Sequence, residues 1–430
     1  MKYLISTLGC KVNQYETQAI ETILQSRGHT PVKEGERADA VIVNTCAVTA
    51  ESGRKSRQLI RRLREENPGC LTAVCGCYSQ LSPEEVADAG GNVIFGTNDK
   101  QKFVDTIEMA VNSDDNFLKI DKPFERCEFE KLPAGAVNGR TRALLKIQDG
   151  CVNFCSYCII PYTRGRLRSL SVEDAVEETK RLRDEGYKEL VITGIEIASY
   201  GVDLPGKPSL AEVVCECAEN AGDMRIRLGS LEPRVITKEL CEAMAKHKNI
   251  CRHFHLALQS GCDKTLAAMN RKYDTARFYE SCCLLREYFP GCGLTCDMIT
   301  GFPGETEEDF NSTLEFIQKC AFSDMHIFPY SRRPGTAADK MPNQCTNKVK
   351  SERSARAIAV CEKMHKEFLE ESVGKVLPVL FETQENGIWE GHSDTYVLVK
   401  LKAEGEKLRN QVLNIKITGV VGDYLTGERV

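Results

Sequence analysis

Short apolar segments alternate with helix-forming segments along most of the 430-residue chain, and this alternation restricts the fold more than any other feature. Near the N-terminus, strands are expected at 2–7, 40–45, 71–75 and 92–95. Helical patterns lie between them, at about 14–27, 51–66, 82–89 and 98–112. Regular alternation of this kind predicts an α/β domain with a small, doubly wound parallel sheet.

The alternation resumes with longer units, which predict strands at 142–148, 188–193, 225–230, 253–258, 294–299 and 324–329. Six strand–helix units favour a partial (β/α)6 barrel, a fold whose active site lies at the C-terminal ends of the strands. A long helical stretch, about 346–371, ends this region. Beyond it, short alternating segments and turn residues predict a small antiparallel β-barrel.

These patterns divide the chain into three domains and a linker. The expected boundaries are 1–115 for the N-terminal domain, 116–136 for a polar linker, 137–370 for the central barrel and 371–430 for the C-terminal barrel. No segment has the roughly 20 apolar residues that a membrane helix needs, and the N-terminus lacks the pattern of a signal peptide. A cytoplasmic protein without membrane contact is expected.

Three cysteines, Cys151, Cys155 and Cys158, follow the first strand of the central barrel with the spacing Cys-x3-Cys-x2-Cys. Closed structural zinc sites usually have four ligands. A [4Fe–4S] cluster with three cysteine ligands keeps one iron free to bind another molecule. The alternative is a redox or structural site that a distant cysteine completes.

A second set of cysteines follows successive strands of the N-terminal sheet. Cys10, Cys46 and Cys77 come after the strands at 2–7, 40–45 and 71–75, so all three are expected at one edge of a parallel sheet. They could hold a second cluster with an open iron, or they could be three unrelated loop cysteines. Cys75 competes with Cys77 for the third position, but it belongs to the apolar strand, whereas Cys77 lies in the following loop.

The chain resembles the radical S-adenosylmethionine methylthiotransferases. The resemblance rests on the triplet at 151–158 and on Gly9-Cys10…Asn13, Asn44-Thr45-Cys46 and Gly76-Cys77, in this order. It covers the whole chain, and the C-terminal barrel resembles the RNA-binding TRAM domain of that family. The stretch from Ser6 to Glu16 is similar to the MtaB type, which adds a methylthio group to C2 of N6-threonylcarbamoyladenosine at tRNA position 37.

The resemblance implies two [4Fe–4S] clusters and S-adenosylmethionine as cofactors. One cluster would be held by Cys151, Cys155 and Cys158 and would generate a radical from S-adenosylmethionine; the other, on Cys10, Cys46 and Cys77, would carry the sulfur. Tyr157 fills the aromatic position usual before the last radical cysteine. Further candidates for contact with S-adenosylmethionine stand at strand ends: Gly194, Glu196, Ser230, Gln259 and Asp297. Ile195 replaces a glycine of the usual Gly-Gly-Glu, so Glu196 could instead be a structural carboxylate.

Three arginines beside the radical triplet, Arg164, Arg166 and Arg168, suggest an anionic partner, although the net charge of −5 argues against indiscriminate nucleic-acid binding. They would suit the phosphates of a tRNA anticodon stem-loop, whose reacting base must leave its stack. The resemblance also implies an electron donor such as flavodoxin or ferredoxin, and a sulfur donor.

Two alternatives accompany this reading. The substrate could be isopentenyladenosine-37 of tRNA or an aspartate of ribosomal protein S12. In a different class, the chain could be an RNA-binding protein whose clusters are structural or redox-sensing. The absence of any convincing Ser/His/Asp or paired-carboxylate site fits radical chemistry at an unreactive C–H bond better than acid–base catalysis.

Overall fold

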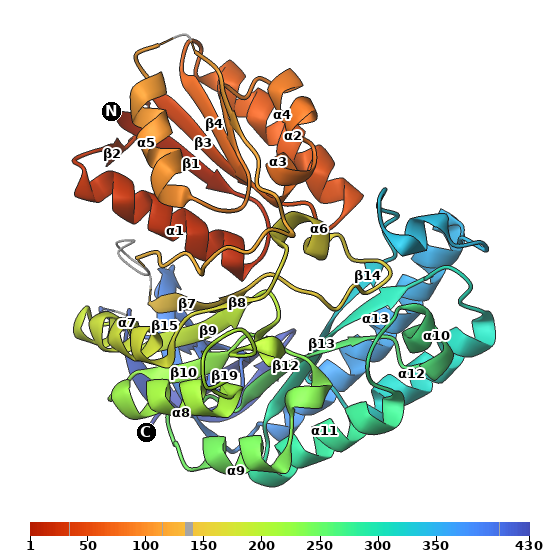
Figure 1. The fold of residues 1–430 in the computed structure, drawn as a ribbon. Helices are drawn as coiled ribbons and strands as arrows, with labels where there is room; N and C mark the ends of the chain where they lie inside the picture. Colours follow the sequence, from red (N-terminus) through yellow and green to blue (C-terminus); the bar gives the residue numbers. More distant parts are fainter. Residues whose placement is uncertain (34, 114, 134–140, 404) are drawn as a thin grey trace.

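The computed structural model describes residues 1–33, 35–113, 115–133, 141–403 and 405–430, which form three parts (Figure 1). The expected boundary between linker and central domain, at residues 136–137, lies outside the described residues. Within those residues, no helix is both long and apolar enough to cross a membrane.

The N-terminal part is an entirely parallel six-stranded sheet with the order β2-β1-β3-β4-β5-β6. Its strands are β1 (Lys2–Thr7), β2 (Thr30–Pro31), β3 (Ala40–Thr45), β4 (Leu71–Gly76), β5 (Val93–Phe95) and β6 (Phe117–Lys119). β3 and β4 are buried along their whole length, which explains their continuous apolar sequences. β6 lies in the segment expected to be a linker, and it pairs with β5 at the edge of the sheet.

Helices cover both faces of this sheet, as expected for a doubly wound fold. They are α1 (Lys11–Ser26), α2 (Ala50–Glu66), α3 (Cys77–Leu81), α4 (Pro83–Asp88) and α5 (Lys100–Ala110). α1 and α5 lie on one face, and α2, α3 and α4 on the other (Figure 1). The core under α1 and α5 continues into the central part, so the two parts share one hydrophobic core.

The central part is the expected partial barrel, built on six parallel strands. They are β7 (Arg142–Asp149), β9 (Glu189–Gly194), β10 (Arg225–Leu228), β12 (His253–Gln259), β13 (Gly293–Thr300) and β14 (Asp324–Pro329). Two short strands join them: β8 (Arg168–Ser169), antiparallel to β7, and β11 (Ser230–Leu231), parallel to β12. An isolated bridge between Ile226 and Ile250 connects the two four-stranded halves.

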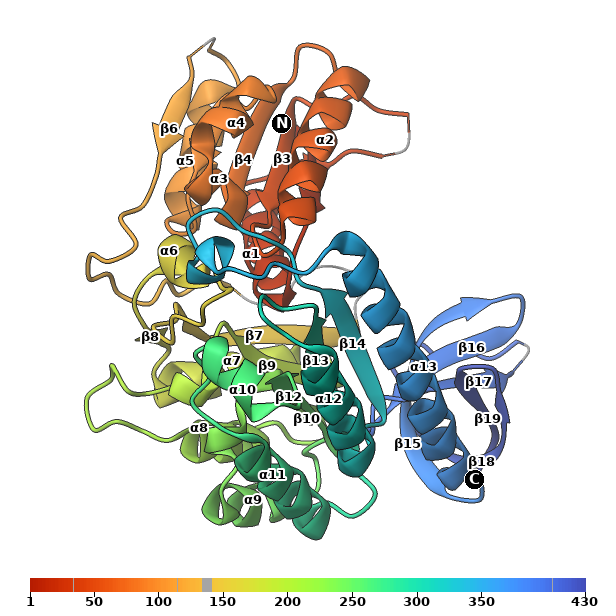
Figure 2. The same cartoon turned by 90° about the vertical axis from the view of Figure 1, so that its right-hand side faces the viewer.

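The helices of the central part pack around the outside of these strands, except the first, which lies between the strands and the N-terminal part and packs on α3 (Figures 1 and 2). They are α6 (Ile160–Arg164), α7 (Val172–Asp184), α8 (Leu210–Asn220), α9 (Lys238–Ala245), α10 (Asp263–Ala268), α11 (Thr275–Tyr288), α12 (Glu307–Cys320) and α13 (Asn347–Glu371). Short 3-10 turns follow β9, β11 and β14, at Ile197–Ser199, Pro233–Val235 and Ala337–Lys340.

The C-terminal part is a closed five-stranded barrel with the order β15-β16-β17-β19-β18. Its strands are β15 (Val376–Glu385), β16 (Ile388–Ser393), β17 (Leu398–Lys402), β18 (Val412–Val421) and β19 (Tyr424–Arg429). Every pairing is antiparallel except that of β17 with β19, which is parallel and closes the barrel.

Arginines at the beginnings of the central strands hold the C-terminal barrel. Arg225 and Arg227 donate to the backbone carbonyls of Pro378, His392, Ser393 and Asp394, at 2.9–3.2 Å. Both also bind Glu189, which is buried and fixes their orientation. Because the radical triplet follows the opposite end of β7, the C-terminal barrel docks away from the cysteine loop.

Candidate functional site

The cysteines of the N-terminal set lie at one edge of the sheet, as predicted. Cys10 is the N-cap of α1, Cys46 follows β3, and Cys77 is the first residue of α3. A Cβ on Gly9 would lie 3.1 Å from the Cβ of Cys46, so the loops carrying Cys10 and Cys46 touch. Removal from water raises the pKa of all three thiols, and the positive charge of Arg164 opposes the rise at each.

Asn13 joins the loops that carry these cysteines. Its side-chain amide donates to the carbonyls of Leu8, at 3.0 Å, and Thr45, at 2.9 Å. Its oxygen accepts from Arg164 Nη2 at 3.2 Å and from the Cys10 thiol at 3.6 Å. Asn13 is buried, so these bonds fix the spacing between the loops after β1 and β3.

Cys75 and Cys77 lie on opposite faces of the sheet. Cys75 packs in the core with Tyr15, whereas Cys77 packs in the other core with Ile159, which follows the radical triplet directly. Gly76 between them has φ +106°, and a Cβ there would lie 2.5 Å from both Asn44 Oδ1 and the Thr45 carbonyl. Only glycine permits this close turn, which sends Cys77 toward Cys10 and Cys46.

The radical triplet occupies the loop between β7 and α6. Backbone bonds shape it: Cys151 N–H donates to the Gly165 carbonyl at 3.0 Å, and Cys158 N–H donates to the Cys155 carbonyl at 2.9 Å. Arg271 supports the loop from the segment after α10, with Nη1 3.2 Å from Cys155 Sγ. Burial raises the pKa of Cys151 and Cys158 to about 12, so thiolates here need a compensating positive charge.

The two cysteine sets adjoin. α3, which begins at Cys77, packs on α6, and the Cys77 thiol contributes to the raised pKa of Cys158. Among the described residues, no three Cys, His, Asp or Glu side chains meet as they would around a single metal ion. Three separated thiols suit a cluster, in which each cysteine binds a different iron.

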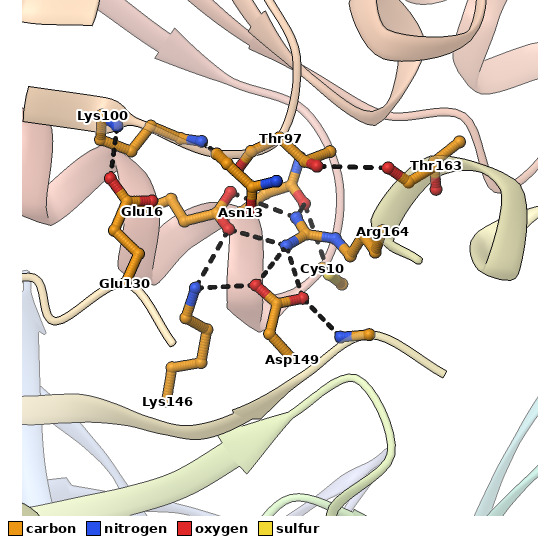
Figure 3. A network of polar contacts seen from close by, with 12 residues as sticks. Cys10, Asn13, Glu16, Thr97, Lys100, Glu130, Lys146, Asp149, Thr163 and Arg164 are labelled. Atoms are coloured by element: carbon orange, nitrogen blue, oxygen red, sulfur yellow. Dashed lines mark hydrogen bonds and ion pairs between the residues drawn. The ribbon is translucent and has the colours of Figure 1, made fainter. Parts of the chain in front are cut away.

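Arg164 lies at the centre of a buried polar network between the two sets (Figure 3). Its guanidinium contacts Glu16 at 2.7 Å, Asp149 at 3.1 Å and Asn13 at 3.2 Å. Lys146 completes the network, 2.9 Å from Asp149. Burial alone would raise the pKa of Glu16, but the cations around it, Arg164 first, lower it to about 2.

This network corrects the expectation that Arg164 and Arg168 contact RNA. Arg164 is buried and satisfied by carboxylates, and Arg168 is buried against Asp149, at 3.4 Å, and Asn98, at 3.2 Å. Neither can reach a phosphate without breaking buried ion pairs. Arg166 is exposed and stays a candidate. Its backbone N–H donates to the carbonyl of Pro123 at 3.2 Å. The next residue, Phe124, contacts two further exposed aromatic rings, Phe154 and Tyr162.

Glu196 lies next to the radical loop. Its Oε2 accepts from Asn153 at 3.0 Å, and its N–H donates to Gln148 Oε1 at 2.7 Å. Burial, aided by the negative charge of Glu232, raises the pKa of Glu196 to about 7. Gly194 ends β9, and a Cβ there would lie 2.8 Å from the Gln148 carbonyl, so it allows β7 and β9 to approach closely.

Of the other candidate contacts for S-adenosylmethionine, Ser230 and Gln259 lie at strand ends as expected, whereas Asp297 lies within β13. Ser230 is exposed on β11, and Gln259 ends β12 with φ +66°. Asp297 Oδ2 lies 3.2 Å from His255 Nε2, which gives both a structural partner. Tyr157 packs in a separate apolar cluster with Met269, Phe302, Tyr330 and Ala338.

Sequence reasoning did not identify Glu16, Lys146, Asp149 or Arg271 as parts of the site. For three of them a signal existed: Lys146 and Asp149 interrupt an apolar strand, and Glu16 lies on a helix face whose neighbours are apolar. Charges at core positions are almost always paired, so each should have implied a buried partner. Arg271 carried no such signal.

A partial (β/α)6 barrel with a three-cysteine loop after its first strand defines a radical S-adenosylmethionine enzyme. The model of the radical SAM superfamily matches residues 145–317, and the model described as "Uncharacterized protein family UPF0004" matches residues 2–96. A structure of the radical S-adenosylmethionine methyltransferase TsrM from Kitasatospora setae, with cobalamin and a [4Fe–4S] cluster bound, superposes with a TM-score of 0.56. It covers 95% of this chain and 80% of its own at 14% identity, which shows a shared fold.

Two relatives define the family more closely within the radical S-adenosylmethionine enzymes. The "Threonylcarbamoyladenosine tRNA methylthiotransferase MtaB" of Bacillus subtilis is 38% identical over 99% of this chain and 95% of its own length. The "tRNA-2-methylthio-N(6)-dimethylallyladenosine synthase" of Pelotomaculum thermopropionicum is 35% identical over 99% and 97%. The chain therefore belongs to the family of radical S-adenosylmethionine tRNA methylthiotransferases. It is an enzyme, and membership implies a [4Fe–4S] cluster and S-adenosylmethionine as cofactors.

Proposed function

We propose that the protein adds a methylthio group to C2 of N6-threonylcarbamoyladenosine at position 37 of tRNA. The observation that carries the proposal is the adjacency of two three-cysteine sets: α3, which begins at Cys77, packs on α6, which begins two residues after Cys158. A reaction that needs both a radical and a sulfur donor requires such adjacency. Among the relatives, MtaB proteins from three organisms carry this substrate in their names.

Cys151, Cys155 and Cys158 would hold the cluster that binds S-adenosylmethionine, and Cys10, Cys46 and Cys77 would hold a second one. When bound, the first cluster supplies the electron that cleaves S-adenosylmethionine, and the second supplies the methylthio group. The residues present fit this assignment. Burial disfavours free thiolates at Cys151 and Cys158, and iron would stabilise them.

The protein's own groups orient these sites and exclude water. Arg271 Nη1 lies beside Cys155 Sγ, and the positive charge of Arg164 favours the thiolate form of Cys77. Glu196 faces the radical loop, where its carboxylate would accept the ammonium group of S-adenosylmethionine. Gly194 keeps β7 and β9 together below it, and Tyr157 packs behind the loop.

The domain roles follow the three parts of the fold. Residues 1–115 would hold the second cluster, and residues 137–370 would perform the radical chemistry. Residues 371–430 would bind RNA as a TRAM domain. Arg166 and the aromatic rings of Phe124, Phe154 and Tyr162 form an exposed surface suited to a phosphate and unstacked bases. An electron donor such as flavodoxin or ferredoxin and a sulfur donor would complete the reaction.

The test is nucleoside analysis of tRNA from a strain that lacks the gene. Loss of 2-methylthio-N6-threonylcarbamoyladenosine, with restoration by the wild-type gene, is the expected result. Loss of 2-methylthio-N6-dimethylallyladenosine instead would identify N6-dimethylallyladenosine as the substrate, as the name of the relative from Pelotomaculum thermopropionicum suggests. If reconstituted protein forms no 5′-deoxyadenosine from S-adenosylmethionine with dithionite, radical catalysis is excluded and an RNA-binding role with structural clusters is favoured.

A further inference from the structure

A cavity of about 420 Å³ lies where all three parts of the protein meet. Lys11 and Gln14 of α1 line it from the N-terminal part, and Leu144 of β7 and Val191 of β9 line it from the central barrel. The C-terminal barrel contributes another side, which includes Glu382, Thr383, Tyr396 and Arg409. A cavity of this size accommodates a small polar group rather than a folded domain.

The cavity has an excess of positive charge. Lys11 and Arg409 are exposed within it, and neither has an ion pair or side-chain hydrogen bond in the described part of the chain. Among the described residues that line it, Glu382 is the one acidic side chain, and it is already bound by Arg142, with Nε 2.6 Å from Oε1, and by His392 at 2.7 Å. Within the described part of the chain, two cations therefore line the cavity without an acidic side chain paired to them. Such charges in a concave site favour a bound anion.

The surroundings support an anion at this place. Arg142 lines the same cavity, and its guanidinium lies over the Tyr396 ring, 5.5 Å from the ring centroid. The Tyr396 ring forms one wall, and it is held by stacking on His253 and His392 at 4.7 and 5.0 Å between ring centroids. The side of the cavity that Tyr396 forms is therefore held in place.

The cavity also adjoins the second cysteine set, because Lys11 follows Cys10 directly in the chain. An adenine whose C2 lay at Cys10 would extend its N6 substituent away from the cysteines. The threonylcarbamoyl substituent ends in a carboxylate and a hydroxyl, whereas a dimethylallyl group has no polar atom. Only the first of these matches a cavity with two unpaired cations.

We propose that this cavity receives the carboxylate of the N6-threonylcarbamoyl group and that Lys11 and Arg409 bind it. The inference rests on the proposed function and deepens it, because it names the residues that select this substrate over a neutral N6 substituent. A backbone phosphate of the same RNA is the other source of an oxyanion. The experiment must therefore separate the two.

The test measures binding to the reconstituted holoenzyme without reductant, so that no turnover occurs. Three anticodon stem-loops of one sequence carry N6-threonylcarbamoyladenosine, its methyl ester or plain adenosine at position 37. Wild-type protein should bind the free carboxylate about tenfold or more tightly than the ester, as expected for a charge-assisted contact. Lys11→Gln and Arg409→Gln should lose most of this preference and bind the ester and plain adenosine as wild type does. Lys407→Gln, on the same exposed segment as Arg409, is the matched control and should keep the preference.

Two results would overturn the inference: variants that keep the wild-type preference, or variants that weaken all three RNAs equally, which would assign the cations to phosphate. An iron content equal to that of wild type in each variant shows that the clusters are still bound. The proposed function fails separately, if wild-type enzyme with reductant leaves the threonylcarbamoyl RNA without a methylthio group. If it modifies that RNA while Lys11 and Arg409 are dispensable for the preference, only the role of the cavity is wrong.

Discussion

Arg164 Nη1 lies 2.7 Å from Glu16 Oε1, and neither side chain has any surface exposed to water. Arg164 ends α6 of the central part, whereas Glu16 lies in α1 of the N-terminal part. The pair therefore fixes two domains, each carrying one cysteine set, at a defined separation. A buried pair of this kind contributes little net stability, but its disruption leaves an uncompensated charge.

Arg164→Met should destabilise the protein by about 3–5 kcal/mol, because Glu16 and Asp149 would stay buried without their main partner. Arg166→Met, two residues away and exposed, should stay within about 0.5 kcal/mol of wild type. Thermal and urea unfolding of both variants check this difference. Equal midpoints for the two variants would contradict the importance of the network.

Cys77→Ser should lower the iron content from about eight to about four per chain after anaerobic reconstitution, since one cluster would be lost. Cys75→Ser should keep about eight, because Cys75 faces the opposite core. Iron and sulfide analysis distinguishes the variants. Equal iron contents in the two variants would mean that the turn at Gly76 does not determine which cysteine is the third ligand of the cluster.

Affinity for S-adenosylmethionine should rise with pH. Glu196 has a pKa of about 7 in this site, so its carboxylate is ionised only above that value, when it attracts the ammonium group of the ligand. If only the ionised form binds, affinity should increase about tenfold between about pH 6 and pH 8.

Glu196→Gln should bind weakly with no such pH dependence, and Glu177→Gln, exposed on α7, should behave like wild type. Calorimetric titration across this range provides the measurement. If the affinity of Glu196→Gln for S-adenosylmethionine still depended on pH, the titrating group would be a residue other than Glu196.

Gly76→Ala should destabilise the protein more than Gly69→Ala. Both glycines have positive φ, so both variants have the backbone strain of about 1–2 kcal/mol. At Gly76 the new methyl would also meet Asn44 and Thr45 at 2.5 Å, whereas nothing lies within 4 Å at Gly69. The unfolding midpoint should fall further in Gly76→Ala than in Gly69→Ala, and the iron content should fall only in Gly76→Ala. Similar values for the two variants would show that the end of β3 moves to make room for the methyl group.

Periodicity was sufficient to predict the parallel sheet and the central barrel, because buried strands such as β3 and β4 are short and mostly apolar. It was insufficient for β6, whose three residues are too few to show a period, and for β19, whose parallel pairing with β17 depends on closure of the whole barrel. Tertiary contacts decide short strands of this kind.

At the site, the sequence did not predict the directions in which side chains point. The order of the parallel strands brings Cys10, Cys46 and Cys77 to one edge whatever their rotamers. The environment of Arg164 and Arg168, by contrast, depends on carboxylates that come from another domain and another strand. A run of arginines has the same sequence whether it faces solvent or a buried Glu16.

The arginines that hold the C-terminal barrel have a consequence for where the enzyme acts. Arg225 and Arg227 bind backbone carbonyls of that barrel, and Arg252 pairs with its Asp394 at 2.7 Å. A barrel fixed in this way cannot swing on a tether. An RNA held by it would present one nucleotide, set by the span between barrel and cysteines, so the protein would select the modified position by measuring length along the RNA.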